Sequence, residues 1–452
     1  MYKSSKPIGF WSAVLLGVGA MVGAGIFALL GQAGSIAGTA VWISFLYGGA
    51  VAALSGYSFG RLGASFPSAG GLVEYLVRAY GGGFFAGTSA FLLYLSGVLA
   101  LALIAKAFGS YGSAVIVGTS VPWITNLLAL TIIGVLTWVN FRGAGDVALF
   151  ENVVVAIKVT VLCLFIVLGA LHVDPARLAF TTYPDQFHIA ASIGFTFFAF
   201  EGFRVITNTA EDMENPSRQL PRAMMTAILL VAVLYVLMAL VVFGNLDVKQ
   251  AVTAKDYALA EAAGPVFGSA GFLVVGVVAM ISTASAINAN LYAVTNVAYK
   301  MATDGELPAA FGRPIGHSRE GLLITAAVIT VLVPTLELSA LAVIGSVTIL
   351  LVHVAVHAGH WRLVRETGAS RLLVALAILA NAAVVAVVVG FEYQQTHHSL
   401  WYLTAFVGAA VLLELLFRRV SGRHIQRRGS PYWSAAASPD SPPATNPPPR
   451  HP

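Results

Sequence analysis

Twelve long apolar stretches constrain the fold of this chain more than any other feature of its sequence. A helix needs about 20 apolar residues to cross a bilayer, and only helices and closed barrels can satisfy their backbone hydrogen bonds in lipid. The stretches lie approximately at 8–31, 38–60, 84–110, 123–141, 150–172, 187–210, 222–244, 266–299, 321–337, 339–360, 371–391 and 399–417. We therefore predict an all-α polytopic membrane protein with 12 transmembrane helices.

The composition agrees with a chain whose main partner is the lipid bilayer. Of the 452 residues, 58% are hydrophobic and only 10% are charged, whereas soluble domains carry about 25% charged residues. The net charge of +5 is spread over the loops and the C-terminal tail, so we expect no nucleic-acid partner. The single cysteine, Cys163, excludes a disulfide framework within one chain.

Basic residues are concentrated in alternate loops, which predicts the orientation. They follow the even-numbered stretches, whereas the opposite loops hold few: Arg177, Lys249 and Lys255. Cytoplasmic loops of membrane proteins carry the excess of Lys and Arg. We expect a multi-pass protein of the cell membrane with both termini in the cytoplasm. The tail over 421–452 is rich in Pro, Ser and Ala and is expected to be disordered.

The first stretch contains GVGAMVGAGIFALLGQAG, in which six of eighteen residues are glycine. Glycine costs about 1 kcal/mol relative to alanine inside a helix, so this density predicts a break, centred on Gly23, Ala24 and Gly25. Glycines can also serve close helix packing. The sixth stretch repeats the oddity with Glu201-Gly202 at its middle. Paired interruptions at matching places in two halves of a chain indicate a transporter binding site.

The electrostatics of such breaks favour a zwitterionic substrate. The second half of span one would begin near Gly25 and Ile26 with free N–H groups, which attract a carboxylate. The first half of span six would end near Phe200 with free carbonyls, which attract an ammonium group. An α-amino acid has this charge pattern. We predict substrate contacts from Gly23, Ala24, Gly25, Ile26, Phe200, Glu201 and Gly202.

Four segments together resemble the amino acid–polyamine–organocation (APC) permease family, and are most similar to its proton-coupled, broad-specificity amino acid transporters of the ApcT type. They are MVGAGIF in span one, FPSAGGLVEYLVRAYG after span two, EDMENPSRQLPRA after span six and YKMATDGELP after span eight. The resemblance runs from about Gly9 to Arg419.

The resemblance implies a LeuT-type fold of two inverted five-helix repeats followed by two peripheral helices. The domains would then be a cytoplasmic N-terminus over 1–7, repeats over 8–172 and 187–360, peripheral helices over 371–417 and the tail over 421–452. It also implies secondary active transport of amino acids by alternating access, as proton symport or, alternatively on the same scaffold, as exchange of amino acids or amines. From other functional classes, an ion channel or a ligand-binding membrane sensor remains open.

A lysine in the fifth span, Lys158, is the strongest candidate for proton coupling. It lies about 12 Å from the start of its segment at 1.5 Å per residue, a depth that argues against a side chain extended to the membrane interface. Ionisable residues inside a membrane usually have a function. The resemblance implies that its ammonium group lies between span one, near Gly19, and span eight, near Ser282 and Ser285, where sodium-coupled relatives hold sodium.

For the other candidate residues, a structural role is an alternative to a functional one. Tyr94 lines the substrate path or packs within the bundle. Glu201 contacts the substrate ammonium, takes part in proton transfer or pairs with Arg204, three residues on. His353, His357 and His360 have helical spacing, but pore lining or interfacial placement is favoured over metal binding. No nucleophile–base arrangement or phosphate-binding loop occurs, so we expect no enzymatic activity, no catalytic residues, no metal and no cofactor.

Overall fold

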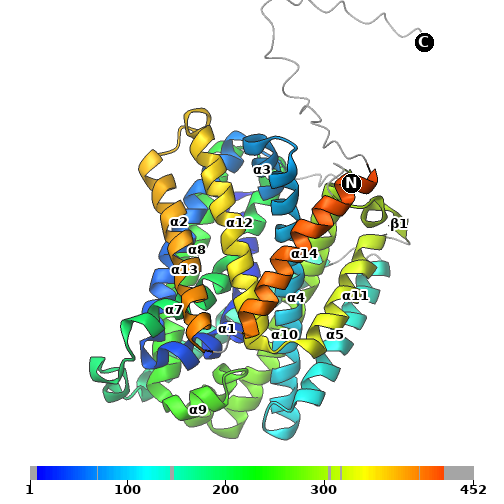
Figure 1. The fold of residues 1–452 in the computed structure, drawn as a ribbon. Coiled ribbons are helices and arrows are strands. Elements are labelled where there is room, and N and C mark those ends of the chain that lie inside the picture. Colours follow the sequence, from blue (N-terminus) through cyan, green and yellow to red (C-terminus); the bar gives the residue numbers. More distant parts are fainter. Residues whose placement is uncertain are drawn as a thin grey trace, which may run out of the picture.

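A computed structural model describes residues 8–68, 70–142, 147–303, 307–315, 318–395 and 398–421. Within these ranges one long helix corresponds to each predicted span (Figure 1). They are α1 (Phe10–Ala37), α2 (Val41–Ser65), α4 (Phe84–Val117), α5 (Pro122–Arg142), α6 (Val147–Gly169), α7 (Gln186–Phe200) with η5 (Glu201–Asp212), α8 (Pro216–Asn245), α10 (Ala258–Thr303), α11 (Glu320–Thr335), α12 (Leu338–Thr367), α13 (Arg371–Gln395) and α14 (His398–Ser421).

Shorter elements connect these helices. They are α3 (Leu72–Tyr80), α9 (Val248–Thr253), five 3₁₀ turns, η1 (Gly38–Ala40), η2 (Ala170–His172), η3 (Pro175–Leu178), η4 (Phe180–Thr182) and η6 (Ala309–Gly312), and the antiparallel pair β1 (Pro314–Ile315) and β2 (Ser318–Arg319). In the described residues, ten helical segments are long and apolar enough to cross a membrane, and Phe10–Gly23 and Glu320–Thr335 are shorter apolar helices. The prediction of an all-α polytopic membrane protein is confirmed.

The core of the bundle is built around α1. This helix contacts α7, α8, α10 and η5, while α2 packs against both α7 and α8. A second group forms around α4, against which α5, α11, α12 and α14 pack, and α13 covers α12 and α7. In Figure 1 the connecting helix α9 lies at the lower end of the bundle and α3 at the upper end. We call these the α9 end and the α3 end.

Both predicted interruptions are present, with differences in detail. The non-helical residue in α1 is Val22 (φ −76°, ψ 32°), one position before the predicted run Gly23–Gly25. The prediction of free carbonyls required the sixth span to unwind after Phe200, and this prediction is wrong. The span continues as the 3₁₀ helix η5 over twelve residues, which is unusual because such runs seldom exceed four residues. The inverted relation of the two repeats stays a prediction.

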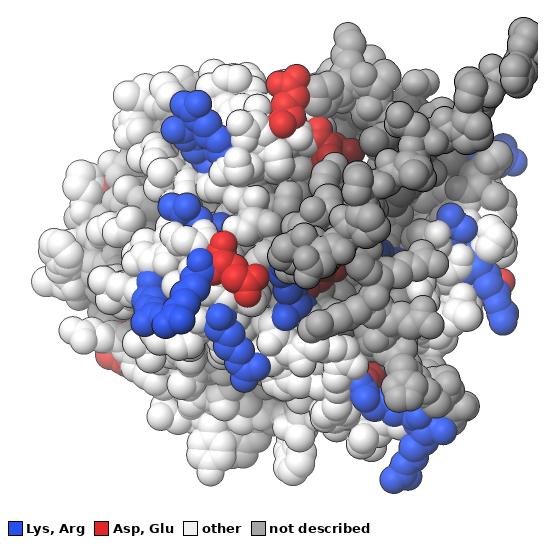
Figure 2. Space-filling view, turned by 90° about the horizontal axis from the view of Figure 1, so that it is seen from above, with Lys and Arg blue, Asp and Glu red and all other residues white. Residues whose placement is uncertain are grey.

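Basic side chains are spread over the α3 end of the molecule. Figure 2 views this end from above and shows Lys and Arg side chains outnumbering Asp and Glu among the coloured residues. Basic residues near the C-terminal ends of α2, α5 and α12 are exposed, namely Arg61, Arg142, Arg362 and Arg365. The terminal segments 1–7 and 422–452, including nearly all of the predicted disordered tail, lie outside the described residues.

Candidate functional site

The kink in α1 is held by side chains from two neighbouring helices. The carbonyls that precede a helix end have no partner within the helix, and two of them are bound here. The Lys158 ammonium group donates to the carbonyl oxygen of Gly19 at 2.7 Å, and the Ser282 hydroxyl donates to that of Val22 at 3.2 Å. Lys158 is 1% exposed and Ser282 is fully buried; Ser285, on the same helix, is also buried. The structure thus brings together the predicted lysine, Gly19 and Ser282.

A third carbonyl of the kink is bound by α8, through a residue that sequence reasoning missed. The Tyr235 hydroxyl donates to the Met21 carbonyl at 2.7 Å and lies 3.3 Å from the Ala199 carbonyl near the end of α7. Tyr235 is fully buried. It therefore joins the kink of α1 to the last turn of α7. A buried tyrosine in an apolar span gives no local signal of such a role.

Removing this hydroxyl tests the joint. In Tyr235→Phe the Met21 carbonyl loses a hydrogen-bond partner in the core, a loss that costs about 1–3 kcal/mol for a buried polar group. We expect a lower melting temperature in detergent micelles than for the unaltered protein. Tyr47→Phe, which removes a hydroxyl from a side chain that is 56% exposed, is the control and should leave the melting temperature unchanged. Equal melting temperatures for both variants would contradict this role.

The glycines of α1 admit neighbouring helices at close range. A methyl group at Gly19 would lie 2.7 Å from the Val155 side chain of α6, and one at Gly23 would lie 2.5 Å from the Ala286 side chain of α10. Both are shorter than normal carbon contacts. At Gly19 the side chain that lies against the glycine is Val155, three residues before Lys158 on α6.

The two interruptions touch each other through backbone. A methyl group at Gly25 would collide with the Ala199 carbonyl oxygen and the Tyr235 hydroxyl, and one at Gly202 would lie 2.5–2.8 Å from the backbone of Ala20 and its neighbour. This arrangement leaves no room for a ligand between Gly25 and the end of α7. The structure therefore shows the predicted substrate residues packed together.

The remaining predicted substrate residues lie in the same core. Ile26 and Phe200 are fully buried, and the ring of Phe200 lies 5.1 Å from that of Tyr235 between centroids. The side chain of Ala24 lies outside the described part of the chain.

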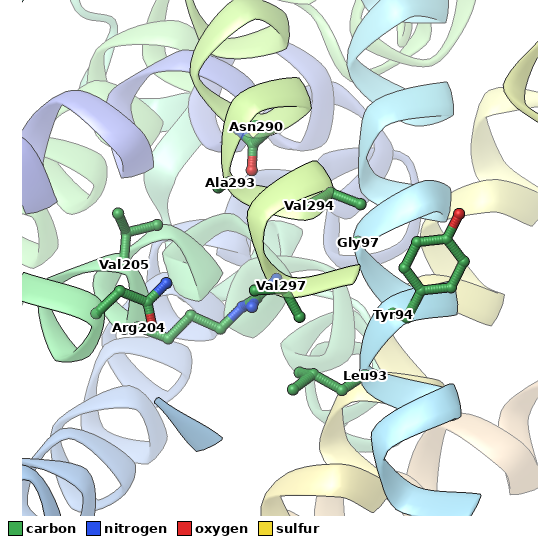
Figure 3. A pocket seen from close by; sticks show the side chains of 10 residues that line it. Leu93, Tyr94, Gly97, Arg204, Val205, Asn290, Ala293, Val294 and Val297 are labelled. Atoms are coloured by element: carbon green, nitrogen blue, oxygen red, sulfur yellow. The ribbon is translucent and has the colours of Figure 1, made fainter. Parts of the chain in front are cut away.

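A small pocket of about 20 Å³, room for about one water molecule, lies beside the interruption of the sixth span, between α4, η5 and α10 (Figure 3). Its lining residues are Leu93, Tyr94, Gly97, Arg204, Val205, Asn208, Asn290, Ala293, Val294 and Val297. Figure 3 shows the long Arg204 side chain extending toward Val297. Of the predicted substrate residues, only Tyr94 lines this pocket, and its hydroxyl is hydrogen-bonded to Thr325 of α11 at 2.8 Å.

Glu201 is paired with two side chains at the start of η5. Its carboxylate lies 2.6 Å from the Nε of Arg204 and 3.5 Å from the Nε2 of His353 on α12. Glu201 is 7% exposed and His353 is fully buried. The predicted alternative of an ion pair with Arg204 is therefore realised. The contact with His353 has no sequence signal, since 152 positions separate the residues.

The three histidines of α12, for which pore lining or interfacial placement was expected, are buried inside the bundle. His353, His357 and His360 are at most 1% exposed and pack against α2. Among the described residues, no group of three or more His, Cys, Asp or Glu has the arrangement of a metal site. Hydroxyl groups on α2 supply hydrogen bonds that buried imidazoles need, and this makes the burial of His357 and His360 possible.

The α9 end of the bundle is closed over α1. The Gln32 amide donates to Asp256 at 2.6 Å, and Lys106 of α4 donates to the Leu336 carbonyl at the end of α11 at 2.6 Å. Burial raises the pKa of Asp256, and Lys255, Gln32 and Lys106 oppose that rise. Because an acid with a raised pKa binds a proton more readily in the packed arrangement, falling pH favours this closure over an opened one.

Comparisons with known proteins agree with the sequence motifs. The family model described as "Amino acid permease" matches residues 8–411. The inner membrane transport protein YbaT of Escherichia coli is 35% identical over 424 residues, which cover 93% of this chain and 98% of that protein. An uncharacterized protein of Methanocaldococcus jannaschii is 33% identical over 431 residues, covering 94% and 98%. The branched-chain amino acid permease BcaP of Bacillus subtilis is 26% identical over 380 residues, covering 78% and 80%.

These descriptions denote transport and not enzymatic activity, as the sequence predicted. The match spans both interruptions, Lys158 and all but the last of the predicted helices. The chain therefore belongs to the amino acid permease family, within the APC permeases that its motifs resemble.

Proposed function

We propose that this protein is a secondary active transporter that carries amino acids together with protons across the cell membrane by alternating access. The observation that carries the proposal is the buried Lys158, whose ammonium group lies on the Gly19 carbonyl just before the kink of α1. A lysine buried at a helix interruption can bind and release a proton where the substrate site opens and closes. Family membership supports amino acids as the substrate class.

The substrate site of this proposal lies where α1 and the α7–η5 junction meet. The backbone N–H groups after the kink would bind the carboxylate, and the Glu201 side chain at the start of η5 would bind the ammonium group. Since Gly25 and Gly202 pack against backbone here, a substrate requires the two interruptions to separate. The pocket lined by Arg204 and Asn208 would then be the exit path toward the α3 end.

The orientation belongs to the same proposal. The positive charge of the α3 end (Figure 2) supports a cytoplasmic location for that end and for both termini. With the α9 end closed by Gln32 and Asp256 and a pocket beside η5, the arrangement fits a transporter that faces or is about to face the cytoplasm.

Uptake into proteoliposomes tests the function. Purified protein is reconstituted, a labelled mixture of amino acids is offered outside, and each standard amino acid is added as an unlabelled competitor, with and without an inward proton gradient. We expect the gradient to drive accumulation above the outside concentration. A channel or a sensor cannot concentrate solute, and an exchanger requires amino acid inside the vesicles. Accumulation that ignores the gradient, or that occurs only in preloaded vesicles, would refute proton symport.

A further inference from the structure

A continuous row of buried polar side chains leads from the interruption of the sixth span along the face between α12 and α2. We call it the histidine relay. It consists of Glu201, His353, His357, Ser58, His360 and Thr367. His353 begins it beside Glu201, and Thr367, the last residue of α12, ends it next to the exposed Glu366. The fourteen positions from His353 to Thr367 span about 21 Å at 1.5 Å per residue.

Hydrogen bonds connect the relay without a gap from His357 to Thr367, the part that leads to the α3 end. The Nδ1 of His357 lies 2.9 Å from the Ser58 hydroxyl, and the same hydroxyl lies 2.8 Å from the Nδ1 of His360. The Nε2 of His360 lies 2.8 Å from the Thr367 hydroxyl. The Nε2 of His357 is hydrogen-bonded to Ser55 at 3.1 Å. A serine between two imidazole nitrogens is the arrangement that a proton relay requires.

The hydrogens of this row can point in either of two directions. In one, Ser55 donates to His357, His357 donates through Nδ1 to Ser58, Ser58 donates to His360 and His360 donates to Thr367. In the other, every one of these bonds is reversed. Because Ser58 has one hydrogen and lies between two Nδ1 atoms, it must accept from one and donate to the other. Passing one proton along the row converts the first arrangement into the second, and each group gains one proton and loses one.

The part of the relay nearest the sixth span joins His357 to Glu201 through His353. The rings of His353 and His357 lie 5.9 Å apart between centroids, and the Nε2 of His353 lies 3.5 Å from Glu201. Neither ring nitrogen of His353 has a hydrogen-bond partner among the described residues. A rotation of this ring breaks no hydrogen bond of His353, and a proton from Glu201 enters His357 at Nε2 in place of the bond of that nitrogen to Ser55.

Apolar rings insulate the relay from its surroundings. Phe59 of α2 stacks on His357 with centroids 5.0 Å apart, and Phe59 and Phe197 contact the edge or face of His353 at 4.8 and 5.5 Å. From α13, the neutral Asn381 donates to Ser55. Among the described residues, the charged groups at the row are Glu201 with its partner Arg204 near the sixth span, and the exposed Glu366 with its partner Arg78 at the α3 end. Between these two ends the buried row is shielded from bulk solvent.

We propose that the histidine relay conducts protons between Glu201 and the α3 end of the bundle, along a path separate from Lys158. The proposal deepens the proposed proton-coupled function and rests on it. A purely structural row would also hold α12 on α2, so the test must distinguish proton movement from folding. Proton-driven uptake and substrate exchange, measured on the same preparation, are two readouts that together make this distinction.

The experiment uses the full chain in proteoliposomes with two separate substitutions, His357→Gln and Ser58→Ala. The probe is the strongest competitor from the amino acid panel, in labelled form. One readout is uptake driven by a proton gradient, together with acidification reported by a pH dye trapped inside. The other is counterflow at equal pH, which exchanges loaded substrate without net proton movement. His172→Gln, an exposed histidine outside the row, is the matched control.

We expect both relay variants to lose at least tenfold in gradient-driven uptake and in acidification, while counterflow stays within about twofold of the unaltered protein. Equal losses in both readouts, or no loss in either, would overturn the relay. A purely structural role would lower gradient-driven uptake and counterflow by the same factor. If the unaltered protein shows no proton coupling, the proposed function fails and the relay with it. If Ser58→Ala does not fold, His357→Gln alone decides, since glutamine keeps hydrogen-bonding groups but takes up no proton near neutral pH.

Discussion

Replacing Lys158 with alanine should abolish proton-driven accumulation of amino acids. The side chain is 1% exposed and its ammonium group binds the Gly19 carbonyl, so the variant removes the buried group that can take up and release a proton. We expect uptake under an inward proton gradient to fall to the level of empty vesicles. Counterflow should survive in part, because it does not require net movement of protons.

Lys158→Arg sharpens this test. Arginine can still donate to the Gly19 carbonyl, but it stays charged at every physiological pH. It should therefore fail in accumulation like alanine although the hydrogen bond is retained. Lys249→Ala is the matched control, since that lysine is exposed on α9 and should leave the dependence on the proton gradient intact. Uphill uptake by Lys158→Ala, measured in the same vesicles, would disprove coupling through this residue.

Substituting alanine for Gly202 should abolish transport for a different reason. The added methyl group would lie 2.5 Å from the carbonyl carbon of Ala20 and 2.6 Å from the backbone nitrogen of Met21. Backbone atoms cannot rotate away as a flexible side chain can, so α1 and η5 must move apart. Overpacking of this kind typically costs about 1–3 kcal/mol. We expect at least a tenfold loss of uptake and a lower melting temperature.

Gly134→Ala provides the comparison, because a methyl group at that position of α5 meets no atom within 4 Å. That variant should transport normally and be as stable as the unaltered protein, or more stable by up to about 1 kcal/mol from the gain in helix propensity. If Gly202→Ala behaved like Gly134→Ala in uptake and in melting temperature, the contact between the two interruptions would have no part in transport.

The transmembrane helices could be predicted because a span requires a long apolar run, and this signal is local. The bend in α1 was predicted within one residue, since the glycines around Gly23 mark it. The pairing of Lys158 with Gly19 came from the family resemblance, as nothing in the spacing of the two residues reveals it. The partners of Glu201 illustrate the limit. Arg204 lies three positions away and was foreseen, whereas His353 comes from another helix.

The same limit explains the residues that sequence reasoning misplaced. Tyr235 binds the Met21 carbonyl only because α8 crosses α1 at the kink, and the crossing point depends on side-chain packing along both helices. The histidines of α12 were expected to line the pore or to lie near the interface, since they fall near the predicted cytoplasmic end of their span. Their burial depends on Ser55 and Ser58 of α2, whose small hydroxyl side chains carry no sequence signal of a partner some 300 positions away.

The three carbonyls bound at the α1 kink have a consequence for the timing of transport. Lys158, Ser282 and Tyr235 come from three different helices, so the first half of α1 cannot leave the bundle without breaking all three hydrogen bonds together. At about 1 kcal/mol each, the bonds make the released arrangement rarer by about a hundredfold. A bound substrate that replaced one or two of these partners would make release more frequent, so the empty carrier would rarely open by chance and would leak few protons.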